Sequence, residues 1–407
     1  MNCRHCKAPL RLTFIDLGTC PPSNAYLKAC DLNAPEIRYP LRVLVCEQCW
    51  LVQTQDYTRS EELFTQDYAY FSSTSPSWVA HAARYTENMI QRFQYGPGSL
   101  VIELGSNDGY LLKHFLDRGI ECLGVEPTAS TADAAERLGI SVLRDFFSES
   151  LALKLAVSGR QADLIIGNNV YAHVPDINDF TKGLKQALKP KGIITLEFPH
   201  LLRLIQGAQF DTIYHEHYSY LSLTSVIQIF QAAGLRVWDV SELSTHGGSL
   251  RIYGCHAEDD RPESPTVNEV LSEECRFGLR RSETYQGFQA HADRIKDDLL
   301  VFLIEQKRAG KQVVGYGAAA KGNTLINYAG VRADLLPCVC DAAVSKQGKY
   351  LPGSRIPIVT EAIIRKKKPS FILILPWNLR NEIMDQLEYI KAWDGQFVTA
   401  IPQLDVV

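Results

Sequence analysis

The sequence predicts an α/β protein in three parts, and three observations support this prediction. Four of the eleven cysteines form two Cys-x-x-Cys pairs near the N-terminus. From about Ser75, short apolar runs alternate with stretches of helical spacing, which is typical of a parallel sheet with crossover helices. Near the C-terminus, a strand, a glycine loop and a helix follow one another again. We therefore expect a small module over residues 1–65, a core over 66–258 and a smaller α/β domain over 259–407.

The composition is that of a globular protein without a strongly charged surface. Of the 407 residues, 46% are hydrophobic and 22% are charged, and the formal net charge is −4. This balance provides no basic surface for a nucleic-acid backbone, and no apolar run of about 18 residues predicts a membrane span. The first residues lack the apolar core of a secretory signal, so we expect a cytoplasmic protein. No heptad seam is visible, which favours a monomer.

The two Cys-x-x-Cys pairs, Cys3 with Cys6 and Cys46 with Cys49, predict a structural zinc site. Four thiolates complete a tetrahedral shell around Zn²⁺, and the metal stabilises a module too small for a large core of its own. The alternatives are unrelated core cysteines or a redox pair. The other seven cysteines lie in apolar surroundings and are predicted to be buried: Cys20, Cys30, Cys122, Cys255, Cys275, Cys338 and Cys340.

The first glycine loop of the core indicates a cofactor site. In the run SLVIELGSNDGYLLKHF, the loop residues Glu103, Gly105, Asn107 and Gly109 lie between an apolar strand and a helix. Glycines there let a ligand approach the backbone closely. Glu126 ends the next strand, where an acid can bind both hydroxyls of a ribose. The acidic loop suits an ammonium and a sulfonium group better than a pyrophosphate. A generic nucleotide fold is the alternative.

ELGSNDG resembles the first motif of the class I S-adenosylmethionine-dependent methyltransferases. This resemblance implies that Glu126 binds the ribose of S-adenosylmethionine. It also implies that Asp145 and Phe146, after the third strand, contact the adenine, and that Asn168 lines the methionine end.

The segment after the fifth strand of the core is unusually rich in titratable groups. YHEHYSY, residues 214–220, contains two histidines, a glutamate and three phenols. Open parallel sheets bind ligands beyond the carboxyl ends of their strands, and this segment follows such an end. Histidine is the side chain best suited to take a proton near neutral pH. A polar surface loop with aromatic anchors is the alternative.

Six motifs together resemble, in the same order, the sugar C-methyltransferases, which act on nucleotide-linked keto-deoxysugars in antibiotic and surface-polysaccharide pathways. The motifs are the cysteine pairs, DYAYFSS at 67–73, ELGSNDG, YHEHYSYLS, THGGSLR at 245–251 and GYGAAAKGNTLINY at 315–328. The resemblance covers the whole chain. It implies a zinc module, a methyltransferase core and a C-terminal domain similar to nucleotide-binding folds, with thymidine diphosphate as the usual carrier of the sugar.

The same resemblance implies a mechanism. His217 corresponds to the base that removes a proton from the carbon next to the ketone, and that carbon then attacks the sulfonium methyl. Tyr214 and Glu216 correspond to residues that orient the sugar and the enolate oxygen. Tyr68 or Tyr70, of which Tyr68 is favoured, corresponds to a tyrosine that reaches the same pocket. The chemistry requires no metal.

The rest of the chain extends this prediction. Residues 237–243 and 248–255 are strand-like and predict a hairpin that closes the central sheet, with His246 and Arg251 facing the substrate. Lys321, in Ala-Lys-Gly, is not part of a P-loop, but with the amides of a helix N-terminus it suits a phosphate. The alternative is a degenerate fold without a ligand.

Two other functions stay open on the sequence alone. One is a zinc-containing methyltransferase directed at nucleic acid, which the acidic balance disfavours. The other is an NAD-dependent nucleotide-sugar enzyme that uses the second glycine loop. A dinucleotide site needs an acid at a strand end about 20 residues beyond the glycine loop. The weakness of this alternative is that, beyond Gly317, only Asp341 is both near that position and at a strand end.

Overall fold

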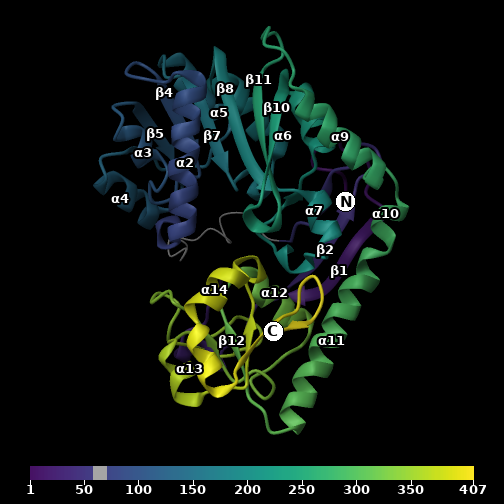
Figure 1. The fold of residues 1–407 in the computed structure, drawn as a ribbon. Helices are drawn as coiled ribbons and strands as arrows, with labels where there is room; N and C mark the ends of the chain where they lie inside the picture. The colour runs from purple at the N-terminus through teal and green to yellow at the C-terminus, as the bar shows by residue number, and fades with distance from the viewer. Residues whose placement is uncertain (58–70) are drawn as a thin grey trace.

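The computed structural model describes residues 1–57 and 71–407, and these residues form three sheets of seven, six and four strands. In Figure 1 the seven-stranded sheet occupies the upper part and the C-terminal domain the lower part. The N-terminal strands lie at the right beside α11 (Phe288–Arg308), which runs along that side of the molecule. The predicted α/β class is therefore confirmed, whereas the boundaries after residues 65 and 258 stay a prediction.

The central sheet has the strand order β10-β11-β8-β7-β4-β5-β6. Its strands are β4 (Leu100–Leu104), β5 (Glu121–Val125), β6 (Ser141–Leu143), β7 (Ala162–Asn168), β8 (Leu188–Pro199), β10 (Leu235–Leu243) and β11 (Ser249–His256). The first five strands in chain order pair in parallel, and β11 pairs antiparallel with both β8 and β10, as the predicted hairpin requires. The strand order reverses between β4 and β7, so their carboxyl ends flank a crevice suited to a ligand.

Helices connect and cover these strands. They are α2 (Pro76–Phe93), α3 (Leu112–Leu116), α4 (Ala129–Arg137), α5 (Glu149–Val157), α6 (Ile177–Ala187), α7 (Leu201–Gln206) and α8 (Leu223–Ala232). Helix α2 begins where the sequence predicts, because the Ser75 side chain accepts a hydrogen bond from Trp78 N and proline occupies the first helical position.

The N-terminal sheet includes a strand from the core. Strands β1 (Leu12–Cys20), β2 (Tyr39–Val45) and β3 (Val52–Thr54) are antiparallel, and β9 (Ser219–Tyr220) pairs with β3. The reactive segment 214–220 therefore ends in a strand of the zinc module's sheet. This long-range pairing was not predicted from the sequence.

The C-terminal sheet has the order β14-β13-β12-β15-β16-β17. Its strands are β12 (Val313–Tyr316), β13 (Val339–Cys340), β14 (Ile358–Val359), β15 (Phe371–Ile374), β16 (Gln396–Thr399) and β17 (Asp405–Val406), with helices α12 (Ala320–Tyr328), α13 (Ala362–Lys367) and α14 (Arg380–Gln386). Helices α9 (Pro265–Phe277), α10 (Glu283–Gln286) and α11 connect this domain to the central sheet. One hydrophobic cluster joins β1, α11 and α12, and within it the rings of Phe14 and Phe288 stack 4.4 Å apart.

Two predictions about cysteines were wrong, because Cys30 and Cys275 are exposed. Cys30 lies in the short 3₁₀ helix Ala29–Asn33, which has no buried residue. The buried positions of α9 are Val267, Val270 and Glu274, so Cys275 falls on the opposite face of that helix.

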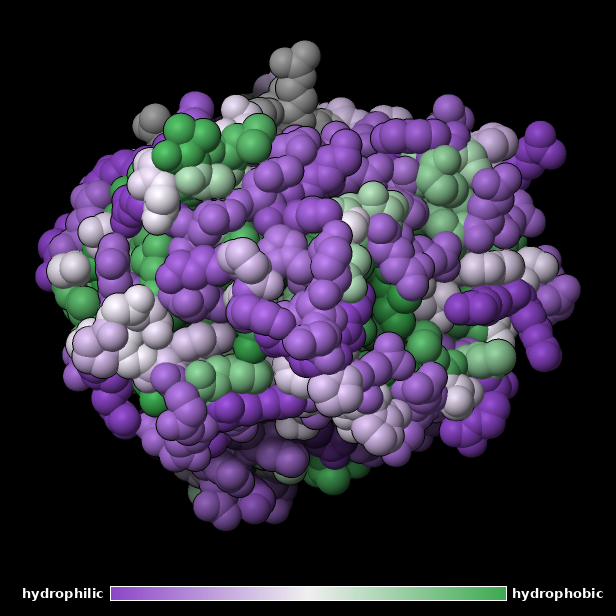
Figure 2. Space-filling view, turned by 90° about the horizontal axis from the view of Figure 1, so that it is seen from above, coloured by the Kyte–Doolittle hydropathy of each residue, from purple (hydrophilic) through white to green (hydrophobic). Residues whose placement is uncertain are grey.

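The surface shows no sign of a membrane span. On the face in Figure 2, hydrophilic side chains predominate and hydrophobic ones form small separate groups. Among the helices that the structure describes, none combines the length and the apolar character needed to cross a bilayer.

A buried ion pair fastens α9 to the central sheet. The Glu274 carboxylate accepts hydrogen bonds from the N–H groups of Leu223 (2.7 Å) and Thr224 (2.9 Å), at the start of α8. It also lies 2.8 Å from His200 Nε2, and neither side chain of this pair is exposed. Because it satisfies the first N–H groups of α8, this one carboxylate links two helices and the end of β8.

We predict that Glu274→Ala lowers the free energy of unfolding by about 3 kcal/mol, since removing one partner leaves buried donors without an acceptor. Urea denaturation measures this change. The matched control is the neighbouring Glu273→Ala, which removes a partly exposed pair with Arg203 and is expected to cost less than about 1 kcal/mol. Equal losses in the two variants would contradict the role given to Glu274.

Candidate active site

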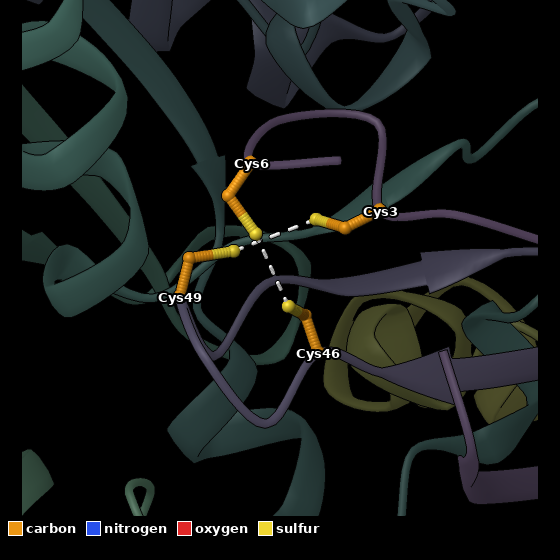
Figure 3. A group of neighbouring side chains, drawn as sticks. All are labelled: Cys3, Cys6, Cys46 and Cys49. Carbon is orange, nitrogen blue, oxygen red and sulfur yellow. Dashed lines mark hydrogen bonds between the residues drawn. The ribbon is translucent and has the colours of Figure 1, made fainter. Parts of the chain in front are cut away.

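The two Cys-x-x-Cys pairs meet at one point, as predicted. The four Sγ atoms of Cys3, Cys6, Cys46 and Cys49 all lie within 4.8 Å of one another, and Figure 3 shows the four side chains pointing toward a common centre. The Cys3–Cys49 and Cys6–Cys46 sulfur pairs are 3.5 and 3.4 Å apart. A tetrahedral Zn²⁺ with bonds of ~2.3 Å separates its sulfurs by about 3.8 Å, so these residues fit a closed structural zinc site.

The carboxyl end of β4 holds buried carboxyl groups. Glu103 is 1% exposed, and its Oε2 has no hydrogen-bond partner among the described residues; the same is true of Asp108 Oδ1. Burial, together with Asp108 and Glu126, raises the pKa of Glu103 well above its ordinary value. Each of these two buried acids has an oxygen without a hydrogen-bond partner among the described residues. A positively charged ligand would stabilise their ionised forms, and the ammonium and sulfonium groups of S-adenosylmethionine carry such charge.

The loop after β4 is shaped by its glycines. Gly105 has φ +63°, and a Cβ there would lie 2.7 Å from a methyl group of Val170. Gly109 has φ +77°, and its Cβ would meet Ile140 at 2.5 Å. Both positions therefore require glycine. Asn107 between them accepts a hydrogen bond from Ser72 N at 2.9 Å, so the residues just before α2 cover this loop.

Glu126, at the end of β5, is oriented toward the same loop. Its carboxylate accepts hydrogen bonds from the N–H groups of Asn107 (2.9 Å) and Thr128 (2.8 Å). Asp145 and Phe146 follow β6, and the Phe146 side chain is 40% exposed, which leaves an apolar ring for an adenine to contact. Asn168 ends β7, and both polar atoms of its amide are buried without a partner among the described residues. The predicted cofactor residues thus follow the adjacent ends of four strands.

A pair of neutral histidines lies beyond β7. His217 Nδ1 is 2.8 Å from the carbonyl of Thr212, and His173 Nδ1 is 2.8 Å from the carbonyl of Glu216. A carbonyl only accepts, so each ring carries its proton on Nδ1 and has an unprotonated Nε2. The two ring centroids are 4.7 Å apart. Burial, and next the neighbouring His173, hold the pKa of His217 well below its ordinary value, and burial lowers the pKa of His173 to about 4.

His173 was missed by the sequence analysis. It follows Asn168 by five residues in the 3₁₀ helix Tyr171–His173, and a lone histidine after a strand has no spacing signature. The one feature of the sequence that could have indicated His173 is its position just after the carboxyl end of a central strand. The histidine pair therefore lies on the segment that follows Asn168, the residue predicted to line the methionine end of the cofactor.

The other predicted residues of the reactive segment surround His217. The Tyr214 ring lies 4.0 Å from the His217 ring between centroids. Glu216 accepts a hydrogen bond from Asn24 Nδ2 at 3.1 Å, and burial raises its pKa to about 7. Tyr68 and Tyr70 lie outside the described residues.

The C-terminal domain contributes a cation to this region. Lys321, in the first turn of α12, donates to Asn378 Oδ1 at 2.6 Å and lies over the ring of Trp377. Burial lowers the pKa of Lys321, and Asp211 offsets part of that effect. The charge of Lys321 also contributes to the lowered pKa values of His217 and His246.

The residues predicted to face the substrate from the hairpin have different outcomes. His246 Nε2 lies 3.0 Å from Asn169 Nδ2, next to the methionine end of the cofactor site. Arg251 forms a buried ion pair with Glu197 and lies over the ring of Tyr85. Because a carboxylate of β8 already binds its guanidinium, the geometry of Arg251 is explained by this ion pair, and its facing the substrate stays a prediction.

The strand order, the glycine loop and the acids at the strand ends together define a class I S-adenosylmethionine-dependent methyltransferase. Comparisons with known proteins specify the family. Residues 3–64 match the family model described as "Putative zinc binding domain", 79–240 match "Methyltransferase domain" and 244–402 match "C-methyltransferase C-terminal domain". Over 406 residues the chain is 33% identical to the C-methyltransferase NovU of Streptomyces niveus, which covers 100% of this chain and 96% of NovU. The chain belongs to this family of C-methyltransferases.

Two more distant matches cover a smaller share of the chain. An uncharacterized methyltransferase of Mycobacterium leprae (strain TN) is 27% identical over 101 residues, 25% of this chain and 37% of its own. The magnesium protoporphyrin IX methyltransferase of Synechocystis PCC 6803, solved with S-adenosylmethionine, is 14% identical with a TM-score of 0.34 and covers 44% of this chain and 81% of its own. The full-length match to NovU and the three family models make the enzyme an S-adenosylmethionine-dependent C-methyltransferase with a zinc-binding module.

We predict that Cys46→Ser lowers the zinc content from one ion per chain to near zero, because one ligand of a closed four-thiolate shell is lost. Zinc analysis of the purified protein measures this. Cys275→Ser is the matched control, since that thiol lies on the exposed face of α9, and it should leave the zinc content at one ion per chain. Full zinc retention in Cys46→Ser would count against the proposed ligand set.

Proposed function

We propose that the enzyme methylates a ring carbon next to the ketone of a nucleotide-linked deoxysugar, with His217 as the base. The observation that carries this proposal is the buried, neutral His217, whose Nδ1 proton is bound by the Thr212 carbonyl and whose Nε2 is unprotonated. Because the ring is already neutral at pH 7, its Nε2 can accept the proton of the substrate directly, with no earlier deprotonation of the imidazole. When bound, S-adenosylmethionine supplies an electrophilic methyl group on sulfur.

The groups around His217 suit the charge that develops after proton removal. Negative charge forms on the ketone oxygen and needs a hydrogen-bond donor placed in advance. The Tyr214 phenol is next to His217, and Glu216, with a pKa of about 7, is partly protonated near neutral pH. Tyr68 is a third donor in this proposal. Neutral side chains also admit an uncharged sugar ring at lower desolvation cost than ions do.

Eight residues are proposed to bind the cofactor or to shape its site. Glu126 binds the ribose, Asp145 and Phe146 contact the adenine, and Glu103 and Asn168 bind the methionine part. Gly105 and Gly109 let the ligand approach the loop, and the Asn107 backbone fixes Glu126. The unpartnered polar atoms of Glu103 and Asn168 support these roles.

Lys321 and the N-terminal amides of α12 are proposed to hold the diphosphate of the substrate. The support is a half-buried lysine from the C-terminal domain whose charge acts on His217. Thymidine diphosphate is the proposed carrier and a monomer the proposed state. All eleven cysteines are free of disulfides, which supports the proposed cytoplasmic location.

We predict that Glu126→Gln weakens S-adenosylmethionine binding roughly 10- to 100-fold, because charge-assisted hydrogen bonds to two hydroxyls are lost. Titration calorimetry measures the affinity. Glu121→Gln, an exposed glutamate at the other end of the same strand, is the matched control and should bind as the wild type does. Unchanged affinity in Glu126→Gln would remove this residue from the ribose site.

We predict that His217→Ala lowers the turnover number at least roughly 100-fold, the usual contribution of a general base, while S-adenosylmethionine affinity stays nearly constant. The assay is mass spectrometry of methylated thymidine diphosphate 4-keto-6-deoxyglucose. His215→Gln is the matched control, because that neighbouring ring is directed at the Pro40 carbonyl. An unchanged rate in His217→Ala would exclude it as the base.

Separate calorimetric titrations with S-adenosylmethionine, thymidine diphosphate and NAD test the proposal as a whole. We expect heat from the first two and none from NAD. NAD is the informative competitor, because Asp341 lies at a strand end next to the second glycine loop, where dinucleotide sites carry the acid that binds a ribose. Asp341 accepts a hydrogen bond from Ala318 N of that loop at 2.7 Å. Binding of NAD without thymidine diphosphate would overturn the proposed substrate class.

A further inference from the structure

A buried cation of the zinc module is bonded to elements on which the placement of the histidine pair depends. Arg4 lies between the ligands Cys3 and Cys6 and is 7% exposed. Its guanidinium donates to the carbonyl of Pro175 at 2.7 Å, to the carbonyl of Thr54 at 3.0 Å and to the Asp56 carboxylate at 2.8 Å. The planar fork of an arginine can hold several acceptors in fixed directions, which the single ammonium of a lysine cannot do.

One of the two carbonyls lies on the segment that carries His173, and the other lies on β3, which is hydrogen-bonded to the segment that carries His217. Thr54 donates its hydroxyl to the His217 carbonyl at 2.5 Å, and its N–H donates to the Tyr218 carbonyl at 3.1 Å. Pro175 follows His173 by two residues. Arg4 thus connects, through one side chain, the strand that fixes His217 and the segment that carries His173.

A second chain of contacts starts at the metal ligands. Gln53 donates from Nε2 to Cys3 Sγ at 3.3 Å and accepts from Arg4 N at 2.8 Å. Gln53 is fully buried and lies in β3, opposite Ser219 of β9. The metal ligands, Arg4 and the catalytic segment are therefore linked by direct hydrogen bonds, the arrangement by which outer groups orient functional side chains.

We propose that Arg4 is a positioning residue for methyl transfer, through which the zinc module sets the relative placement of His217 and His173. The proposal rests on the proposed role of His217. The zinc site fixes the backbone on both sides of Arg4, and the guanidinium transmits that fixed position to two carbonyls on separate segments. Zinc then serves the reaction without touching a substrate.

The test uses the ten histidines of the chain as reporters. Protein labelled with ¹³C at histidine Cε1 gives few signals, which His217→Gln and His173→Gln assign. In Arg4→Gln we expect both of these signals to shift and those of His114 and His256 to stay, with one zinc per chain and unchanged S-adenosylmethionine affinity. The turnover number should fall roughly 10- to 100-fold with little change in KM, as for other outer-shell partners. Arg4→Lys should restore only part of the loss.

Two further measurements separate positioning from folding. Added guanidinium ion, at millimolar concentration, should move the His217 and His173 signals of Arg4→Gln back toward the wild type. It can enter through a cavity of about 390 Å³ lined by Arg4, Asp56 and Pro175. Lys7→Gln is the matched control. The Lys7 side chain donates to the Arg4 carbonyl, and its backbone bond to the Cys3 carbonyl does not depend on the side chain, so this variant should leave the signals in place.

Unshifted His217 and His173 signals in a zinc-loaded Arg4→Gln protein would overturn the proposal. If that variant loses zinc, Thr54→Val is the deciding variant. It removes the hydroxyl that bonds the His217 carbonyl and the Tyr220 side chain but keeps the β3 backbone pairing. An unmoved His217 signal in Thr54→Val would then contradict the linkage. These signals require no sugar substrate. Full activity of His217→Gln would therefore refute the proposed base while leaving the spectroscopic result readable.

Discussion

The pairing of β9 with β3 is the constraint on which the geometry of the catalytic segment depends. Residues 214–218 leave the central sheet and have no strand ladder of their own there. Their far end is fixed because Ser219 and Tyr220 pair with Gln53 and Val52. A segment with this many buried polar groups is stable only where its backbone groups find partners, and the zinc module supplies them. The module is therefore part of the site as well as a folding unit.

Burial sets the charge state of the site. The pKa values of His173, His217 and Lys321 are lowered and those of Glu103 and Glu216 are raised, with burial as the largest cause in each case. Each shift disfavours the ionic form in the absence of ligand. A bound cofactor with positive groups would favour ionised Glu103, and a bound diphosphate would favour protonated Lys321. The arrangement thus couples ligand binding to the charge state, which is common in catalytic sites.

The parts predicted correctly from the sequence are those with local patterns. The cysteine pairs, the glycine loop and the closing hairpin each have a spacing that physical chemistry constrains, and the structure has all three. His173, the β3–β9 pairing and the Arg251–Glu197 pair depend on contacts between segments far apart in the chain. No local pattern encodes them. The burial of Cys30 and Cys275 was mispredicted for the same reason. Apolar neighbours in the sequence do not determine which face of a helix is buried.

The central claim is that the methyl group goes to carbon through a base-generated enolate, and isotope labelling tests it most directly. The enzyme is incubated with S-adenosylmethionine labelled with ¹³C in the methyl group and with thymidine diphosphate 4-keto-6-deoxyglucose whose sugar is uniformly labelled with ¹³C. The account predicts a new methyl signal with a one-bond carbon–carbon coupling to the ring. A labelled methyl without that coupling, at the shift of a methyl ether, would contradict it.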